Sequence, residues 1–112
     1  MEAATTTQTI TAGGIEVRPH EFVALAAGKP LQLTARELQL LEAFVRRSGR
    51  IVSRRELYAV VWGERWRRDE RSVDVYVRKL RVKLELALPE WDFIHTHFGF
   101  GYRFEPNRRQ PV

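Results

Sequence analysis

Cationic and branched apolar side chains alternate at helical spacing in the segment RSVDVYVRKLRVKLELAL, residues 71–88. At about 100° per residue, one narrow stripe of such a helix consists of Val73, Val77, Leu80 and Leu84. The opposite side collects Arg71, Val75, Arg78, Lys79 and Val82, with Asp74 and Lys83 at its margins. In a DNA major groove, arginine can bind guanine or phosphate while valine contacts a thymine methyl group. The pattern favours a DNA-reading helix; the alternative is an amphipathic helix with an ordinary solvated exterior.

Two further arginines, Arg54 and Arg55, stand at the start of a second predicted helix. Unpaired backbone N–H groups point outward in a first helical turn. Cations there oppose the helix dipole unless an anion such as phosphate binds nearby. The pair therefore indicates either a phosphate contact or two solvated arginines beside Glu56.

The sequence contains few of the residue patterns that an enzyme active site or a metal site would need. Cysteine is absent, and the three histidines are His20, His95 and His97. His95 and His97 would share one face of a strand, but a zinc site needs three or four donors. No phosphate-cradling glycine loop accompanies them, and no adjacent carboxylate pair stands in a pocket-like setting. We expect neither an enzyme, nor a metal site, nor a cofactor.

Length, net charge and the absence of long apolar runs indicate what kind of protein this is and which partners it favours. The 112 residues are enough for one domain with its own core. Lysine and arginine number 19 against 14 acidic residues, a net charge of +5 that favours polyanionic partners. No apolar run approaches the roughly 18 residues of a membrane span, and no signal peptide is evident. The sequence predicts a cytoplasmic protein without a membrane partner.

Local signals predict the elements that position these side chains. Thr34 with Glu37, and Ser53 with Glu56, form two capping boxes, which start helices at about 35–48 and 54–62. Leu57, Val60 and Val61 would face the core from the second helix. Asp69 or Ser72 would cap the third helix, which extends to about residue 87.

Short strands are predicted on both sides of the helices. Residues 15–33 alternate as a small antiparallel sheet, and residues 91–104 form a hairpin about Gly99 and Gly101. Such a hairpin after a helix-turn-helix is a wing that can reach phosphate or the minor groove. We place a flexible tail or linker at 1–13, the domain at 14–106 and a C-terminal tail at 107–112.

Four segments resemble the winged-helix DNA-binding (effector) domain of OmpR/PhoB-type response regulators. They are LTARELQLLEAF, GRIVSRRELYAVVWG, RSVDVYVRKLRVKLE and IHTHFGFGYRF, in the order and spacing of that family. The resemblance implies an α+β winged helix-turn-helix with an N-terminal four-stranded antiparallel sheet, three helices and a C-terminal hairpin wing. It further implies control by a phosphorylated receiver domain, for which the preceding 14 residues leave no room, so the chain would be a fragment or a stand-alone regulator.

The resemblance also implies specific roles for residues. The third helix, residues 70–87, would read bases through Arg71, Ser72, Val75, Tyr76, Arg78 and Lys79. Expected phosphate contacts, from the resemblance and the charge pattern together, are Arg54, Arg55, Trp62, Arg81, Lys83, Tyr102 and Arg103. The loop 63–70 would contact the sigma or alpha subunit of RNA polymerase through Glu64, Arg65, Trp66, Arg67, Arg68 and Asp69. The wing residues are His95, His97 and Phe98, with Phe98 where many relatives carry a minor-groove arginine.

Family members usually bind direct repeats as head-to-tail homodimers, so we expect the same assembly here. An alternative from another class is a winged-helix protein-interaction module of the transcription machinery, without specific DNA reading. RNA recognition is less favoured, because the A-form major groove is too narrow for a helix.

Overall fold

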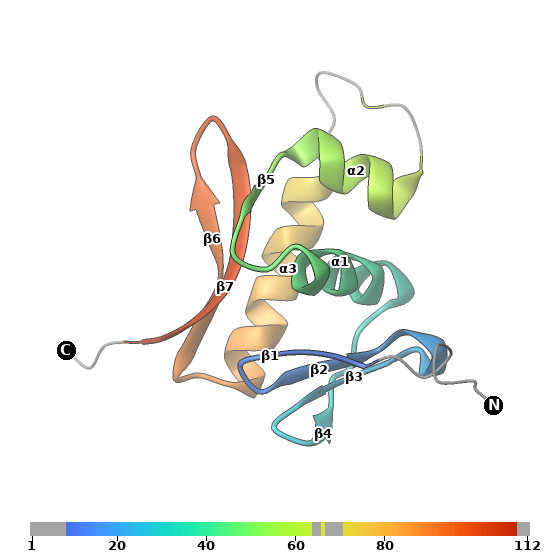
Figure 1. The fold of residues 1–112 in the computed structure, drawn as a ribbon, viewed down its shortest axis with the longest axis vertical. Helices are drawn as coiled ribbons and strands as arrows, with labels where there is room; N and C mark the ends of the chain where they lie inside the picture. The colour runs from blue at the N-terminus through green and yellow to red at the C-terminus, as the bar shows by residue number, and fades with distance from the viewer. Residues whose placement is uncertain (1–8, 64–65, 67–70, 110–112) are drawn as a thin grey trace.

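The computed structural model describes residues 9–63, 66 and 71–109. Figure 1 shows α3 running through the middle of the domain, with α2 near its start and the β6–β7 hairpin along its side. The elements in chain order are β1 (Ile10–Ala12), β2 (Ile15–Arg18), η2 (Pro19–Glu21), β3 (Val23–Ala26), β4 (Lys29–Pro30), α1 (Ala35–Arg46), β5 (Ile51–Val52), α2 (Arg54–Trp62), α3 (Ser72–Ala87), β6 (Trp91–His97) and β7 (Gly101–Arg108).

The N-terminal sheet has four antiparallel strands in the order β1-β2-β3-β4, as expected. Alternation places Ile15 and Val17 of β2 in the core. The sheet begins earlier than the sequence indicated, because β1 lies at Ile10–Ala12 within the segment predicted to be a tail. Ile10 and Ala12 pack against the core, and β7 likewise continues past residue 106 to Arg108.

The first helix begins as predicted and ends earlier. Thr34 Oγ1 accepts from the Glu37 N–H while Glu37 Oε1 accepts from the Thr34 N–H, so the capping box is complete. α1 ends at Arg46 instead of residue 48. Arg47 is the C-cap, and the Gly49 N–H donates to the Phe104 carbonyl, which draws the chain toward β7.

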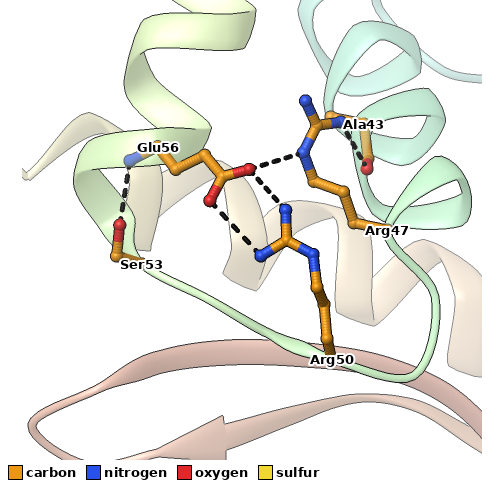
Figure 2. A network of polar contacts seen from close by, with 5 residues as sticks. All are labelled: Ala43, Arg47, Arg50, Ser53 and Glu56. Atoms are coloured by element: carbon orange, nitrogen blue, oxygen red, sulfur yellow. Dashed lines mark hydrogen bonds and ion pairs between the residues drawn. The ribbon is translucent and has the colours of Figure 1, made fainter.

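The second capping box is half-formed. Ser53 Oγ accepts from the Glu56 N–H at 3.0 Å. The Glu56 carboxylate instead points toward Arg47 and Arg50, which donate to it at 2.9 and 2.7 Å (Figure 2). These hydrogen bonds, that from Arg50 first, hold the pKa of Glu56 below its ordinary value. Glu56 therefore fixes the turn between α1 and α2 and also helps to start α2.

α2 has the predicted bounds, but its buried side differs from the prediction. Leu57, Tyr58 and Val61 are buried, whereas Val60 is exposed. α2 packs against α1 and α3, and the side that carries Val60 opens to solvent. The prediction that Val60 faces the core is therefore wrong. Helical periodicity does not show which positions at the edge of the apolar side a neighbouring element covers.

The hairpin after α3 forms the predicted wing and gains a strand that the sequence did not show. β6 and β7 pair antiparallel, and β5 pairs with the outer side of β7 in the order β5-β7-β6. Phe104 of β7 is fully buried and stacks with Phe44 of α1 and Phe93 of β6. The wing therefore shares one core with the helices.

Candidate nucleic-acid interface

One side of α3 is anchored in the core and the other is open. The predicted stripe is buried, with Val73, Val77, Leu80 and Leu84 at 0–1% exposure. On the opposite side Val75 is 47% exposed, and Arg71, Arg78 and Lys79 are exposed around it. α3 thus presents cations around the methyl groups of valine on its open side. Its buried stripe fixes the rotation of the helix about its own axis.

An aromatic cluster supports the first half of this face. Trp62 stacks on Tyr58 with ring centroids 5.2 Å apart, and Tyr76 of α3 meets Trp62 edge-on at 5.5 Å. The Arg36 guanidinium lies 5.1 Å from the Trp62 ring centre, and the Lys79 ammonium lies 4.8 Å from the Tyr76 ring centre. These cation–π contacts hold cations near aromatic rings and fix their direction. Trp62 and Tyr76 are half-buried here, so they support half-buried Arg36 and exposed Lys79 beside them.

The start of α3 is tied to α2 and to the wing by Asp74. Tyr102 of β7 donates from its hydroxyl to Asp74 Oδ1 at 2.5 Å, and Arg54 of α2 donates to Asp74 Oδ2 at 3.0 Å. Burial, and then the hydrogen bond to Asp74, raise the pKa of Tyr102 to about 12. Because Tyr102 is 9% exposed and committed to Asp74, its predicted phosphate contact would require this bond to break.

The capping position of α3 is Arg71, whose side chain makes no cap hydrogen bond. Ser72 lies inside the helix as its first residue, so the predicted cap position at Ser72 is wrong. Asp69, the other predicted cap, lies outside the described residues.

Two further cations expected at phosphate are bound within the fold. Arg81 Nη2 donates to the Ile94 carbonyl and to Thr96 Oγ1, both at 3.0 Å, which clamps β6 to α3. Lys83 donates to the Gln32 carbonyl at 2.8 Å and to Glu37 Oε1 at 2.6 Å. These bonds account for the inward direction of both side chains, which charge alone had suggested would face a ligand.

Glu37 is a buried carboxylate that the sequence analysis treated only as a cap. It is 2% exposed. Burial acts to raise its pKa, but the hydrogen bonds from Lys83 and from the Thr34 backbone outweigh burial, so the pKa of Glu37 lies below its ordinary value. A paired, buried charge of this kind fixes α3 against α1.

The predicted wing residues lie on one outer face and at the tip of the hairpin. Arg103 Nε donates to His97 Nε2 at 3.2 Å and pairs with Glu105, while His95 Nε2 lies 2.9 Å from the Glu105 carbonyl oxygen. Phe98 is exposed in the turn. His95 and His97 share one face of β6, as strand alternation predicts. Arg103 joins them from β7, and Phe98 lies apart.

A groove of about 430 Å³ separates the wing tip from the start of α2. Its walls include Arg54, Arg55, Asp74, His97, Phe98 and Phe100. Arg54 and Arg55 are both exposed there, as expected for residues of a first helical turn. The groove brings together the start of α2, the start of α3 and the wing tip, which the sequence keeps up to some 45 residues apart.

The predicted polymerase-contact loop falls mostly outside the described residues. This applies to Glu64, Arg65, Arg67, Arg68 and Asp69. Trp66 is described and meets Tyr58 edge-on at 5.8 Å. In the described part of the chain, no group of three or more histidine, cysteine or acidic side chains could hold a metal ion. Of the helices described, none has the length and apolar character needed to cross a membrane.

Sequence reasoning missed Asp74 and Arg36 as organising residues. Asp74 was placed at the margin of the α3 face, yet it accepts hydrogen bonds from two other elements. Arg36 caps α2 by donating to the Val61 carbonyl at 2.8 Å across 25 residues. An acidic residue within a strongly basic helix face was the signal available for Asp74; Arg36 gave none.

Comparisons with known proteins agree with this geometry. The family described as "Transcriptional regulatory protein, C terminal" matches residues 28–104, more than half of the chain. CseB, a transcriptional regulatory protein of Streptomyces coelicolor, is 38% identical over 103 residues, which cover 92% of this chain and 42% of CseB. A probable transcriptional regulatory protein of Picosynechococcus sp. is 39% identical over 90 residues, which cover 80% of this chain and 36% of that protein. The chain thus spans about two fifths of the length of these relatives.

Solved structures show the same fold. The RstA DNA-binding domain of Klebsiella pneumoniae, solved in complex with the RstA box, has a TM-score of 0.79 and 28% identity, covering 89% of this chain and 99% of that domain. The α+β winged helix-turn-helix expected from the sequence is confirmed. The chain therefore belongs to the family of OmpR/PhoB-type C-terminal effector domains of transcriptional regulatory proteins.

Proposed function

We propose that the chain binds double-stranded DNA in a sequence-specific manner as a bacterial transcription regulator, with α3 in the major groove. The open face of α3 carries this proposal: Val75 is half exposed among Arg71, Arg78 and Lys79 while the opposite stripe is buried. Solvation explains exposed cations, but it gives no reason for an exposed valine at their centre. A major groove accommodates both groups, since it presents acceptors of guanine and methyl groups of thymine.

Phosphate contacts are proposed at the rim of this face. Arg55 and Arg71 are exposed, and Arg54 needs only to exchange its carboxylate partner for a phosphate. Arg103, His95 and His97 of the wing are half-buried but near the surface. Lys83, Arg81 and Tyr102 have partners inside the fold, so we assign them to holding α3 and the wing in place.

Binding measurements with matched arginine variants test the proposal. A duplex selected from a random pool should bind with an affinity that falls steeply with salt. Arg78→Ala should reduce discrimination between this duplex and a random duplex by about 1–3 kcal/mol. Arg46→Ala, an exposed arginine at the end of α1, is the control and should leave discrimination unchanged. Equal binding of parent and Arg78→Ala to both duplexes would remove α3 from base reading.

RNA polymerase is the second proposed partner, through loop 63–70. The support is the position of this loop directly before α3 and the resemblance to the transactivation loop of the family. Substitution of Arg67 and Arg68 by alanine should preserve duplex binding and lower transcription from a promoter carrying the site. Loss of duplex binding in that variant would place the loop at DNA instead.

A head-to-tail homodimer on direct repeats is also proposed, in the cytoplasm where the DNA target lies. Footprints should then cover two half-sites in the same orientation, about one helical turn apart. A single protected half-site at saturation would contradict this arrangement.

A protein-interaction module is the competing function. Half-exposed Trp66 and Trp91 are its best-supported contacts. A mobility-shift assay at low salt separates the two functions, because a purely protein-binding module leaves every duplex unshifted.

A further inference from the structure

We propose that the wing tip of this chain inserts Phe98 and Phe100 into the minor groove of DNA as apolar wedges that partly unstack a base step. The inference rests on the proposed DNA binding and goes beyond it, because it assigns a mode of recognition to two residues that read no base by hydrogen bonds.

The tip of the hairpin is apolar and exposed. Phe98 is 89% exposed and Phe100 is 74% exposed, with only Gly99 between them. The turn is closed by the Phe100 N–H donating to the His97 carbonyl at 2.9 Å. Large aromatic side chains are usually buried, and exposed clusters of them indicate a contact surface. The two rings are therefore placed where a partner can reach both.

The tip is held rigidly with respect to the helices. A side chain at Gly101 would place its Cβ only 2.1 Å from the Val52 carbonyl oxygen, so the base of the turn presses directly on the chain that leads into α2. Arg81 of α3 holds Thr96 on the other strand. An apolar group that is already positioned loses little conformational freedom on binding. The tip can therefore be inserted without first being ordered.

The neighbouring groups identify the partner as a polyanion. Arg54 and Arg55, both exposed, line the same groove as Phe98 and Phe100. Cations beside exposed aromatic rings suit a duplex, which offers phosphates at the edge of each groove and apolar base faces between them. The same groove includes Asp74 of the first α3 turn. A duplex bound along α3 would therefore continue toward the wing tip.

Phenylalanine wedges act by a known physical route. Apolar side chains that enter from the minor groove separate neighbouring bases and kink the duplex. Pyrimidine–purine steps such as TA and CA/TG are the easiest to unstack. The target site should thus prefer such a step at the position of the wing, although no side chain there reads a base edge.

Fluorescence and affinity measurements on the whole chain test the inference. The probe is a set of duplexes whose sequence was selected from a random pool by the parent chain. Each duplex carries the fluorescent base 2-aminopurine at a different position next to the base pairs that α3 contacts. We expect 2-aminopurine fluorescence to rise at one step on binding the parent and to stay low with Phe98→Ala. Phe98→Ala and Phe100→Ala should each weaken binding roughly tenfold, with the salt slope unchanged because no cation is removed.

Two further variants sharpen the test. Phe22→Ala removes a ring that is 81% exposed in the β2–β3 connection, and it should leave affinity and fluorescence unchanged. Phe98→Arg should bind the duplex more tightly than Phe98→Ala, and its affinity should fall more steeply with salt, by about one further counterion. It should not restore the rise in 2-aminopurine fluorescence. Circular dichroism of each variant checks that it is folded.

Each opposing result has a distinct meaning. Parent-like affinity of both phenylalanine variants overturns the wedge while leaving the proposed function intact. A defect confined to binding of a second copy on a two-site duplex, or to polymerase recruitment, assigns the tip to a protein partner and also overturns the wedge. A parent chain that shifts no duplex refutes the proposed function and this inference together.

Discussion

The Tyr102 hydroxyl donates to the Asp74 carboxylate at 2.5 Å and so joins the wing to the first turn of α3. Asp74 also accepts from Arg54 of α2, so three elements meet at one carboxylate. The orientation of the open α3 face relative to the wing is therefore set by a hydrogen-bonded junction as well as by the core.

Removing the Tyr102 hydroxyl should weaken this junction. We expect Tyr102→Phe to lower the free energy of unfolding by about 1–2 kcal/mol at neutral pH, since a hydrogen bond to a charged group is lost. The raised pKa of Tyr102 favours the protonated tyrosine in the folded state. The contribution of protonated Tyr102 to the free energy of unfolding is therefore complete below pH 10.0 and is lost as the pH rises toward about 12.

Urea unfolding of parent and Tyr102→Phe across that alkaline range measures the effect. The difference between them should shrink as pH rises from 10.0 to about 12. A difference that is constant with pH would mean that the hydroxyl does not hold its proton against Asp74.

Lys83 should matter for stability and not for phosphate binding. Lys83→Met leaves the Glu37 carboxylate buried without its ammonium partner, which should cost about 2 kcal/mol; the partial exposure of Lys83 keeps the loss below that of a fully buried pair. The salt slope of DNA binding should equal that of the parent. A slope reduced by about one would instead show that Lys83 neutralises a phosphate.

Glu56 should make an acid-sensitive contribution to stability. Its lowered pKa means that the carboxylate stabilises the fold above the ordinary value of 4.5 and that this stabilisation is lost as pH falls through the folded-state pKa. Glu56→Gln should destabilise by about 0.5–1 kcal/mol near neutral pH, because the site is partly exposed. Unfolding measured at decreasing pH should show the difference vanishing.

A matched carboxylate provides the control for Glu56. Glu42 makes one i,i+4 pair with Arg46, whereas Glu56 joins two arginines from the α1–α2 connection. Glu42→Gln should therefore cost less than Glu56→Gln. Equal losses would show that the shared carboxylate adds nothing to the turn.

Gly101 and Gly99 should differ sharply in their tolerance of a side chain. Both have positive φ, 138° and 85°, but a Cβ at Gly99 meets nothing within 4 Å while one at Gly101 meets the Val52 backbone. Thermal unfolding should show a loss of about 1 kcal/mol for Gly99→Ala and about 3 kcal/mol or more for Gly101→Ala. Similar losses would mean that β5 can move away from the wing.

Val75 should read a thymine methyl group. Replacing that thymine by uracil should weaken parent binding by about 1 kcal/mol and leave Val75→Ala binding unaffected, as expected for one interaction removed from either side. Val60→Ala removes an exposed valine of α2 instead and is the control, so it should bind both duplexes like the parent. If the losses of binding free energy from uracil and from Val75→Ala add up at every thymine of the site, Val75 contacts none of the thymine methyl groups.

Local rules in the sequence determined which segments form helices and which side of α3 is buried. The first capping box, the bounds of α2 and the buried stripe of Val73, Val77, Leu80 and Leu84 follow from interactions within a few turns of one helix. Gly99 of the wing turn acts equally locally, because its positive φ is needed although a Cβ there would meet nothing within 4 Å. The exposed cations and Val75 then follow, because the other side of α3 is committed to the core.

Only the tertiary structure decided which charged groups remain available to a ligand. Lys83 reaches Glu37 across 46 residues, Arg54 reaches Asp74 across 20, and Tyr102 reaches Asp74 across 28. The two-residue strand β5 likewise exists because β7 is beside it. Periodicity reports the direction of a side chain from its own helix, but a hydrogen-bond partner is supplied by whichever distant segment packs against that side, and that depends on the whole fold.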